Sequence, residues 1–208
     1  SSAASDVYKR QGSAIVLIHD VADPLSNPVT VAQPLMEFDS PYALYESYLV
    51  MANGSELRVI DVDKPSIVLL QQNVTGIQSV QMTAHQGKPV VLYIANDMLQ
   101  AVNIDGQEVQ VPSLPNSETI RLLSVSGIEI LLVSEEQPNT LRLGTIGISG
   151  SLNIVMNAST TEEQNRELED WGQSVDESNA SIEQVSFDSQ YIAVRMNVSA
   201  LDRMVIYD

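Results

Sequence analysis

Aspartate at the end of apolar runs is the most repeated polar feature of this sequence. Asp20, Asp61, Asp105 and Asp208 each close a run rich in Val, Ile or Leu, and a similar turn lies near Ser149. Carboxylates at loop tips can bind a cation, but aspartate also accepts hydrogen bonds from its own backbone in turns. We interpret these residues as turn residues, because no contiguous Asp/Asn/Gly loop of the EF-hand type is present. No metal site is therefore expected.

Other residue types that could carry chemistry are sparse. The two histidines, His19 and His85, lie far apart and show no metal-ligand pattern, and we expect His85 to be a solvated loop residue. The chain has no Cys, which excludes thiolate nucleophiles, thiolate metal sites and disulfides. It also lacks a Gly-x-Ser-x-Gly nucleophile elbow and a phosphate-binding glycine loop. We therefore predict no catalytic residue and no cofactor.

An acidic segment, residues 159–179, interrupts the pattern of short apolar runs. Thr160 could cap a helix, with Glu163 three residues later as in a capping box. Leu168 and Trp171 would then share one helix face. The acidic residues of the segment include Glu163, Glu167 and Asp170.

Two interpretations of this segment remain open. It could be a recognition loop that presents Leu168 and Trp171 to a partner, or that covers one face of the molecule. Alternatively it is a solvated loop whose Trp packs on its own repeat, since acidic runs are commonly just solvated. On the first interpretation Leu168, Trp171, Glu163, Glu167 and Asp170 are the candidate partner-binding residues.

Charge and hydropathy restrict the classes of partner. The chain carries 27 acidic and 10 basic residues, a formal net charge of −17. Such a field opposes binding to nucleic acid and to anionic membranes, and it favours basic partners. An apolar content of 44% supports a packed core. No apolar run approaches the ~20 residues of a membrane span, so we expect no membrane insertion.

The elements that must carry these residues are short strands. Apolar runs rich in Val, Ile and Leu alternate with Gly, Pro, Asn and Asp, which is typical of strands and turns. Asn53-Gly54 lies between residues 48–51 and 57–62, and Asn-Gly is a strong hairpin signal. Asn96-Asp97 separates residues 90–94 from 99–104, and Gln137-Pro138-Asn139 separates 128–133 from 141–148. A last hairpin is expected between 191–196 and 204–207.

A repeat of about 40–45 residues indicates how these hairpins are organised. The interval between Asp20, Asp61 and Asp105 is regular, and it is restored later in the chain when part of 159–179 is removed. Four strands per unit at this period predict an all-β fold, a β-propeller of four-stranded antiparallel blades. The alternative is an open β-sandwich, because strand spacing alone does not separate the two folds.

The predicted blades can be placed on the chain. Residues 12–38 would hold the last two strands of one blade, residues 39–76, 77–115 and 116–158 would form three blades, and residues 180–208 would hold three strands of another. We expect a fragment of about four blades that is truncated at both ends. Residues 1–11, SSAASDVYKRQ, back-translate to a string that looks like a transposase adapter of sequencing libraries, although a natural Ser/Ala-rich leader is the alternative.

Several blades resemble known propeller repeats. Residues 57–65, which follow residues 48–54, resemble the LVIVD repeat, as do residues 18–24, and residues 93–97 are similar to the YVTN type. The last unit, residues 185–194 and 205–208, looks instead like a WD-repeat, and residues 116–158 match neither. The LVIVD and YVTN resemblance implies a secreted or cell-surface propeller. It implies function only by analogy.

These observations together predict a non-catalytic scaffold. Rigid blades would hold variable loops on one face, and those loops would bind a protein or glycan partner outside the cytoplasm or on the cell surface. Three alternatives remain. The propeller could itself carry a lyase or hydrolase site, it could be the accessory domain of a hydrolase or peptidase, or it could be a cytoplasmic WD-repeat scaffold.

Overall fold

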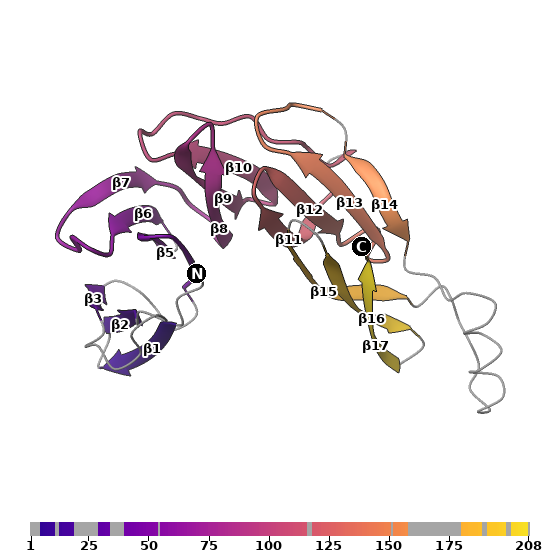
Figure 1. Cartoon of the computed structure of the whole chain (residues 1–208), viewed down its shortest axis with the longest axis horizontal. Coiled ribbons are helices and arrows are strands. Elements are labelled where there is room, and N and C mark those ends of the chain that lie inside the picture. Colours follow the sequence, from indigo (N-terminus) through magenta and orange to yellow (C-terminus); the bar gives the residue numbers. More distant parts are fainter. Residues whose placement is uncertain are drawn as a thin grey trace. The chain divides into compact units, whose positions relative to one another are not determined.

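A computed structural model describes most of the chain. The described residues are 5–10, 13–18, 29–33, 40–53, 55–115, 118–150, 152–157, 180–188, 191–198 and 201–207. They form strands that pair in five antiparallel sheets, each with its strands in sequence order (Figure 1). The chain divides into two compact units, Ser1–Val109 and Gln110–Asp208, and each is described by itself.

The first unit contains three sheets. The first sheet consists of β1 (Ser5–Arg10), β2 (Ser13–Ile18) and β3 (Val29–Gln33). The second consists of β4 (Tyr42–Tyr45), β5 (Tyr48–Asn53), β6 (Glu56–Asp61) and β7 (Val68–Asn73), and the third of β8 (Ile77–His85), β9 (Lys88–Ala95) and β10 (Met98–Asn103). Strand β1 falls within residues 1–11, and because pairing says nothing about the origin of a segment, the adapter interpretation stays a prediction.

The third sheet differs from the expected four strands. Beyond β10 the chain turns at Gly106, and only a short stretch pairs back, with one isolated bridge between Val102 and Glu108. The Val109 amide donates to the Ala101 carbonyl at 2.9 Å, and the Asn103 amide donates to Gln107 at 2.9 Å. No regular strand follows, because beyond Val109 the Gln110 carbonyl accepts instead from the Gly147 amide at 2.8 Å.

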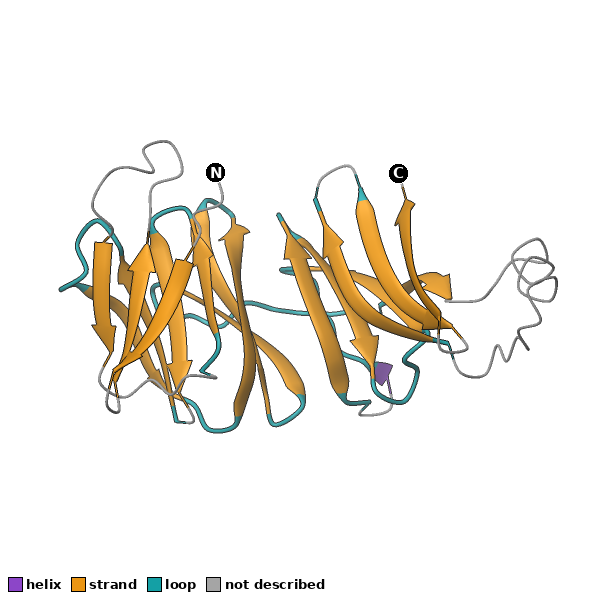
Figure 2. Ribbon diagram, turned by 90° about the horizontal axis from the view of Figure 1, so that it is seen from below, coloured by secondary structure: helices purple, strands orange, loops and turns teal. Residues whose placement is uncertain are grey.

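The second unit contains two sheets. One consists of β11 (Ile120–Ser126), β12 (Glu129–Ser134), β13 (Thr140–Thr145) and β14 (Asn153–Asn157). The other consists of β15 (Ser181–Phe187), β16 (Ile192–Val198) and β17 (Leu201–Tyr207). Figure 2 shows the same strands from below. In the part of the chain that the structure describes, no helix is long and apolar enough to cross a membrane.

The predicted hairpins are confirmed. Asn53 pairs with Glu56, and the Asn53 side chain accepts a hydrogen bond from the Ser55 amide at 3.1 Å. Asn96 and Asp97 have φ of 50° and 64°, so both central residues of this two-residue turn are left-handed, as a type I′ turn requires. This geometry matches the twist of the flanking strands β9 and β10, and it fixes their register.

Each unit has a core shared between two consecutive sheets. In the first unit the core residues come from the sheets β4–β7 and β8–β10: Val50, Ala52, Leu57, Val59, Leu70, Val80, Met82, Val91, Tyr93, Ala95 and Val102. In the second they come from β11–β14, from β15–β17 and from the residue before β15: Leu131, Val133, Leu141, Ala180, Ile182, Val194 and Met196. The first strands of consecutive sheets also touch, β4 with β8 and β11 with β15. Consecutive sheets therefore pack face to face with their first strands together, as neighbouring propeller blades do.

Candidate functional site

The residues predicted to bind a partner lie outside the described part of the chain. Leu168, Trp171, Glu163, Glu167 and Asp170 all fall within residues 158–179, which the structure does not describe. The helix expected after Thr160 lies there as well. The structure does describe both strands that flank this segment, and they define the point at which it joins the fold.

The interpretation of the repeated aspartates as turn residues is confirmed at Asp61. Its carboxylate accepts a hydrogen bond from the Asp63 amide at 3.0 Å, so it folds back on its own turn. At the next turn the equivalent role belongs to Asn103, whose side chain accepts from the Asp105 and Gln107 amides. Asp105 instead pairs with Lys88 on the surface. Asp20 and Asp208 lie outside the described residues, and no group of three or more potential metal ligands occurs among the residues that are described.

The prediction that His85 is a solvated loop residue is wrong. His85 is the last residue of β8, it is only partly exposed, and its Nδ1 is shielded without a hydrogen-bond partner. The loop begins one residue later, because Gln86 and Gly87 adopt φ of 52° and 76° and close a tight hairpin. His19 lies outside the described residues.

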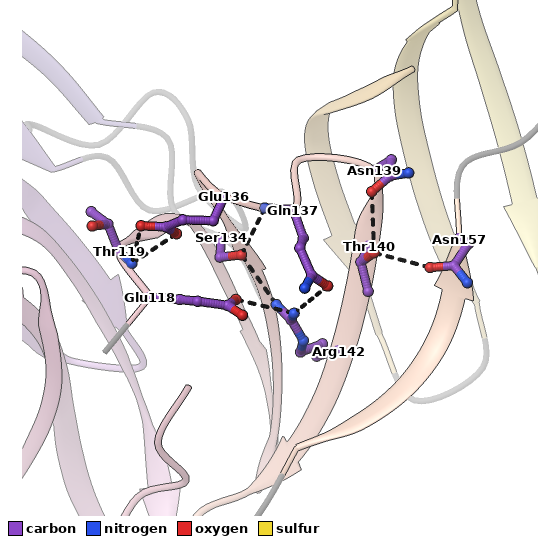
Figure 3. Close-up of polar contacts among 9 residues, drawn as sticks. All are labelled: Glu118, Thr119, Ser134, Glu136, Gln137, Asn139, Thr140, Arg142 and Asn157. Atoms are coloured by element: carbon purple, nitrogen blue, oxygen red, sulfur yellow. Dashed lines mark hydrogen bonds and ion pairs between the residues drawn. The ribbon is translucent and has the colours of Figure 1, made fainter. Parts of the chain in front are cut away.

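A buried arginine organises the polar residues of the β11–β14 sheet (Figure 3). The Arg142 side chain is 4% exposed, and its Nη2 lies 3.0 Å from Glu118 Oε2, in an ion pair outside hydrogen-bond geometry. Arg142 also donates from Nη1 to Ser134 Oγ at 3.2 Å and from Nη2 to Gln137 Oε1 at 2.7 Å. A guanidinium so far from water depends on these partners, because an unpaired buried charge is costly.

This cluster fixes the loop 135–139, which joins β12 to β13. Gln137 is bonded through its side chain to Arg142, and its amide donates to Ser134 Oγ at 3.2 Å. The Glu136 carboxylate accepts from the Thr119 amide at 3.0 Å, and this hydrogen bond is the main reason that its pKa is lowered. The Glu135 amide donates to the Thr119 carbonyl at 3.0 Å. The loop is thus held in one geometry, with Glu135 and Glu136 exposed.

The acidic segment joins the fold beside this loop. Its preceding strand ends at Asn157, whose Oδ1 accepts from Thr140 Oγ1 at 2.9 Å at the start of β13 (Figure 3). Its following strand begins next to Ile182, whose amide donates to the Pro138 carbonyl at 2.7 Å. Both attachment points of residues 158–179 therefore lie beside the C-terminal end of loop 135–139. The chain therefore leaves the described fold after Asn157 and re-enters it at Ala180 at the end of the blade pair that carries the acidic loop.

A second recurring feature is a bulge near the start of the first strand of a sheet. The extra residue is Gln78 in β8, Arg121 in β11 and Glu183 in β15, and each follows an isoleucine. An extra residue breaks the side-chain alternation and re-aims the bulged side chain. Gln78 bonds to Asp97 of its own sheet at 2.8 Å. Arg121 Nη2 and Glu183 Oε2 lie 2.8 Å apart, so the two bulges join neighbouring sheets of the second unit.

The surroundings of Glu183 favour its charged form. The Ser181 hydroxyl and the Arg121 guanidinium both donate to the carboxylate, and they hold its pKa below the usual value despite some desolvation. A folded-state pKa below the unfolded one means that this group stabilises the fold at neutral pH. That contribution disappears as the pH falls through the lowered pKa.

We expect the Glu183→Gln variant to lose less stability in acid than the wild-type chain does. The acid-induced loss of unfolding free energy should differ between the two proteins by a few tenths to about 1 kcal/mol. The effect is small because the Glu183 side chain is 36% exposed and solvent screens its pair with Arg121. Urea unfolding at neutral pH and near pH 4 measures it. An Arg121→Gln variant should reproduce the effect in part, and an unchanged acid dependence in both variants would contradict the assignment.

Comparisons with known proteins agree with this architecture. The WD40 domain of SCAP from fission yeast superposes with a TM-score of 0.56 at 11% identity, over 98% of this chain and 52% of that one. Hsv2 from Kluyveromyces marxianus superposes with a TM-score of 0.55 at 12% identity, over 98% and 66% of the two chains. Hsv2 from Kluyveromyces lactis gives 0.51 at 13% identity, over 100% and 74%. The chain has a β-propeller fold.

Sequence comparison does not assign the chain to a family. No protein-family model matches the chain, and no curated protein matches it in sequence. The chain spans about half of the SCAP domain, with 52% of that domain covered. At 11–13% identity the likeness establishes the fold of this propeller and carries no activity with it.

The residues that organise this end of the propeller were not among the candidates predicted from the sequence. Arg142 stands in the apolar run Leu141-Arg142-Leu143, and a lone charge between two Leu residues in a strand is a signal for a buried ion pair. Nothing in the sequence points to Glu118 as its partner, because the two residues meet only through the pairing of β11, β12 and β13. The same holds for Arg121 and Glu183, which are 62 residues apart.

Proposed function

We propose that this protein is a non-catalytic propeller scaffold, and that it binds a protein or glycan partner at the end of the blades that carries loop 135–139 and residues 158–179. The observation that supports the proposal is that both attachment points of the acidic segment lie beside one end of a loop already fixed by Arg142, Thr119 and Ile182. A rigid scaffold lowers the entropy cost of presenting such loops. The net charge of −17 favours a partner with a basic surface.

The role of Leu168 and Trp171 within this site is part of the proposal. An aromatic anchor surrounded by charged residues is a common arrangement at protein interfaces, where Trp is enriched among the residues that contribute most binding energy. The flanking Glu163, Glu167 and Asp170 would steer a basic partner and make its association rate sensitive to salt. The LVIVD resemblance supports a location outside the cytoplasm or on the cell surface.

The test begins with affinity capture from extracts of the source and with a glycan array, followed by titration of the purified partner. Deleting residues 160–178 should weaken binding at least tenfold, and Glu135→Lys should weaken it several-fold through charge reversal. Glu129→Lys is the matched control, because Glu129 is exposed at the opposite end of the same strand β12. Unchanged binding by the deletion variant would refute the proposed site.

A further inference from the structure

Five Asn-x-Ser/Thr triplets occur in the sequence, and this triplet is the acceptor motif for N-linked glycans in secreted proteins. They begin at Asn53, Asn73, Asn157, Asn179 and Asn197. The composition of the chain would place about two such triplets by chance, so the motif alone does not identify an acceptor. The surroundings of each asparagine separate them. Use of any triplet also requires the location outside the cytoplasm that is part of the proposed function.

Asn73 lies at an exposed end of the sheet β4–β7. It is the last residue of β7, the edge strand of this sheet, so only Glu56 of β6 pairs with it. Asn73 and Thr75, the amide and hydroxyl residues of the triplet, are both exposed. In the part of the chain that the structure describes, the Asn73 side chain has no hydrogen-bond partner. Its amide nitrogen is therefore accessible to a transferase.

Backbone hydrogen bonds fix the turn that follows Asn73. The Val74 amide donates to the Ser55 carbonyl at 3.1 Å, and the Gly76 carbonyl accepts from the Asn96 amide at 3.3 Å. Gly76 adopts a φ of 73°, which reverses the chain before β8 begins. None of these contacts uses the Asn73 side chain or the Thr75 hydroxyl. The fold therefore presents the triplet at a fixed surface turn without engaging its two functional groups.

Two other triplets have their asparagine held by the fold. The Asn53 side chain accepts a hydrogen bond from the Ser55 amide at 3.1 Å inside its hairpin. The Asn157 side chain accepts from Thr140 Oγ1 at 2.9 Å. These bonds fix the orientation of both side-chain amides, whereas the amide of Asn73 is free to turn outwards.

The remaining two triplets lie in the second unit. Asn197 is only partly exposed and belongs to β16, the central strand of its sheet, where it pairs with Ser181 on one side and Asp202 on the other. A bulky group there would meet a strand on each side. Asn179 lies outside the described residues. Among the described asparagines, Asn73 thus combines exposure, a free side chain and an edge position.

We propose that Asn73 carries an N-linked glycan. Its Nδ2 attacks the anomeric carbon of a lipid-diphosphate-linked oligosaccharide, so that an N–C bond forms and the C–O bond to the diphosphate breaks. Nδ2 loses one proton to the transferase, and the lipid diphosphate leaves. The Thr75 hydroxyl is the group recognised two residues after the acceptor. The glycan places a bulky polar group at the end of an edge strand, where it hinders pairing with another chain.

Peptide mapping of the chain purified from its source tests this assignment. Peptide-N-glycosidase in water enriched in heavy oxygen converts a glycosylated asparagine to an aspartate that carries the heavy isotope. We expect this label at Asn73 in the majority of molecules and none at Asn197. An unmodified Asn73 in the source protein would overturn the proposal.

Variants of the full chain secreted from a eukaryotic host provide a second measurement. Asn73→Gln and Thr75→Ala should each migrate as if one glycan lighter than the wild type, and Thr75→Ser should migrate with the wild type. Asn197→Gln is the matched control and should also migrate with the wild type. An Asn73→Gln variant of unchanged mobility would contradict the assignment.

These readouts are mass and mobility, and they are independent of partner binding. A chain glycosylated at Asn73 that binds no partner through residues 158–179 would refute the proposed binding site alone. A chain that binds its partner there and carries no glycan at Asn73 would refute the glycan site alone.

Discussion

Replacing Arg142 by alanine is expected to lower the free energy of unfolding by about 3–5 kcal/mol, the usual cost of breaking a buried ion pair. The variant leaves Glu118, whose side chain is 9% exposed, without its counter-charge. It also removes one of the two donors to Ser134 Oγ and the donor to Gln137 Oε1. Since small domains are stable by only about 5–15 kcal/mol, this is a large fraction of the total. Urea unfolding at neutral pH measures the loss.

A matched pair of variants separates the lost charge pair from lost packing. Arg142→Met with Glu118→Leu replaces both charged groups by apolar ones of similar size, and should recover a large part of the stability lost in Arg142→Ala. Glu118→Leu alone should be nearly as destabilising as Arg142→Ala, because it leaves the buried guanidinium without its counter-charge. If Arg142→Ala costs less than 1 kcal/mol, Arg142 is solvated in the folded state and does not organise loop 135–139.

Replacing Gly144 by alanine is expected to destabilise the second unit by about 1–3 kcal/mol or more through overpacking. A Cβ at this position would overlap Pro112 Cγ and lie 2.6 Å from Leu152 Cδ2. Real Cβ atoms do not approach other heavy atoms so closely, so the strand β13 or the segment around Pro112 must shift. Thermal unfolding followed by circular dichroism measures the effect.

Gly150 supplies the control for this substitution. A Cβ there would meet Ile148 Cγ2 at 3.8 Å, an ordinary contact, and its backbone is not left-handed. Gly150→Ala should therefore change stability by less than about 0.5 kcal/mol, as surface substitutions usually do. Equal effects of the two substitutions would show that Pro112 does not pack against β13.

The hairpins of the fold could be predicted because their signals are local. The pairs Asn53-Gly54 and Asn96-Asp97 are themselves typical turn residues, and the apolar runs on both sides of each pair form the strands. The blade period followed from the regular recurrence of these turns. The fourth strand of the sheet β8–β10 was overpredicted, because residues 107–109 pair only briefly before Pro112.

The polar clusters could not be predicted, because they depend on pairing between distant strands. The bulges at Gln78, Arg121 and Glu183 appear only when the register of the first and second strands is known. From sequence alone, each of these three segments is indistinguishable from an ordinary strand with one polar residue after an isoleucine. The ion pair of Arg121 with Glu183 additionally requires that consecutive sheets pack with their first strands together.

The most direct test of this blade arrangement compares two double-cysteine variants of the chain, which otherwise has no Cys, at low protein concentration. Arg121→Cys/Glu183→Cys joins first strands whose side chains are 2.8 Å apart, and a short bismaleimide should link them within the chain. The variant Ile154→Cys/Met204→Cys places its two thiols on the outer strands β14 and β17. These strands move apart as neighbouring blades spread outward, so the reagent should not link the two thiols. Linking of the outer pair, or failure of the inner pair, would contradict the propeller arrangement and favour a sandwich of aligned sheets.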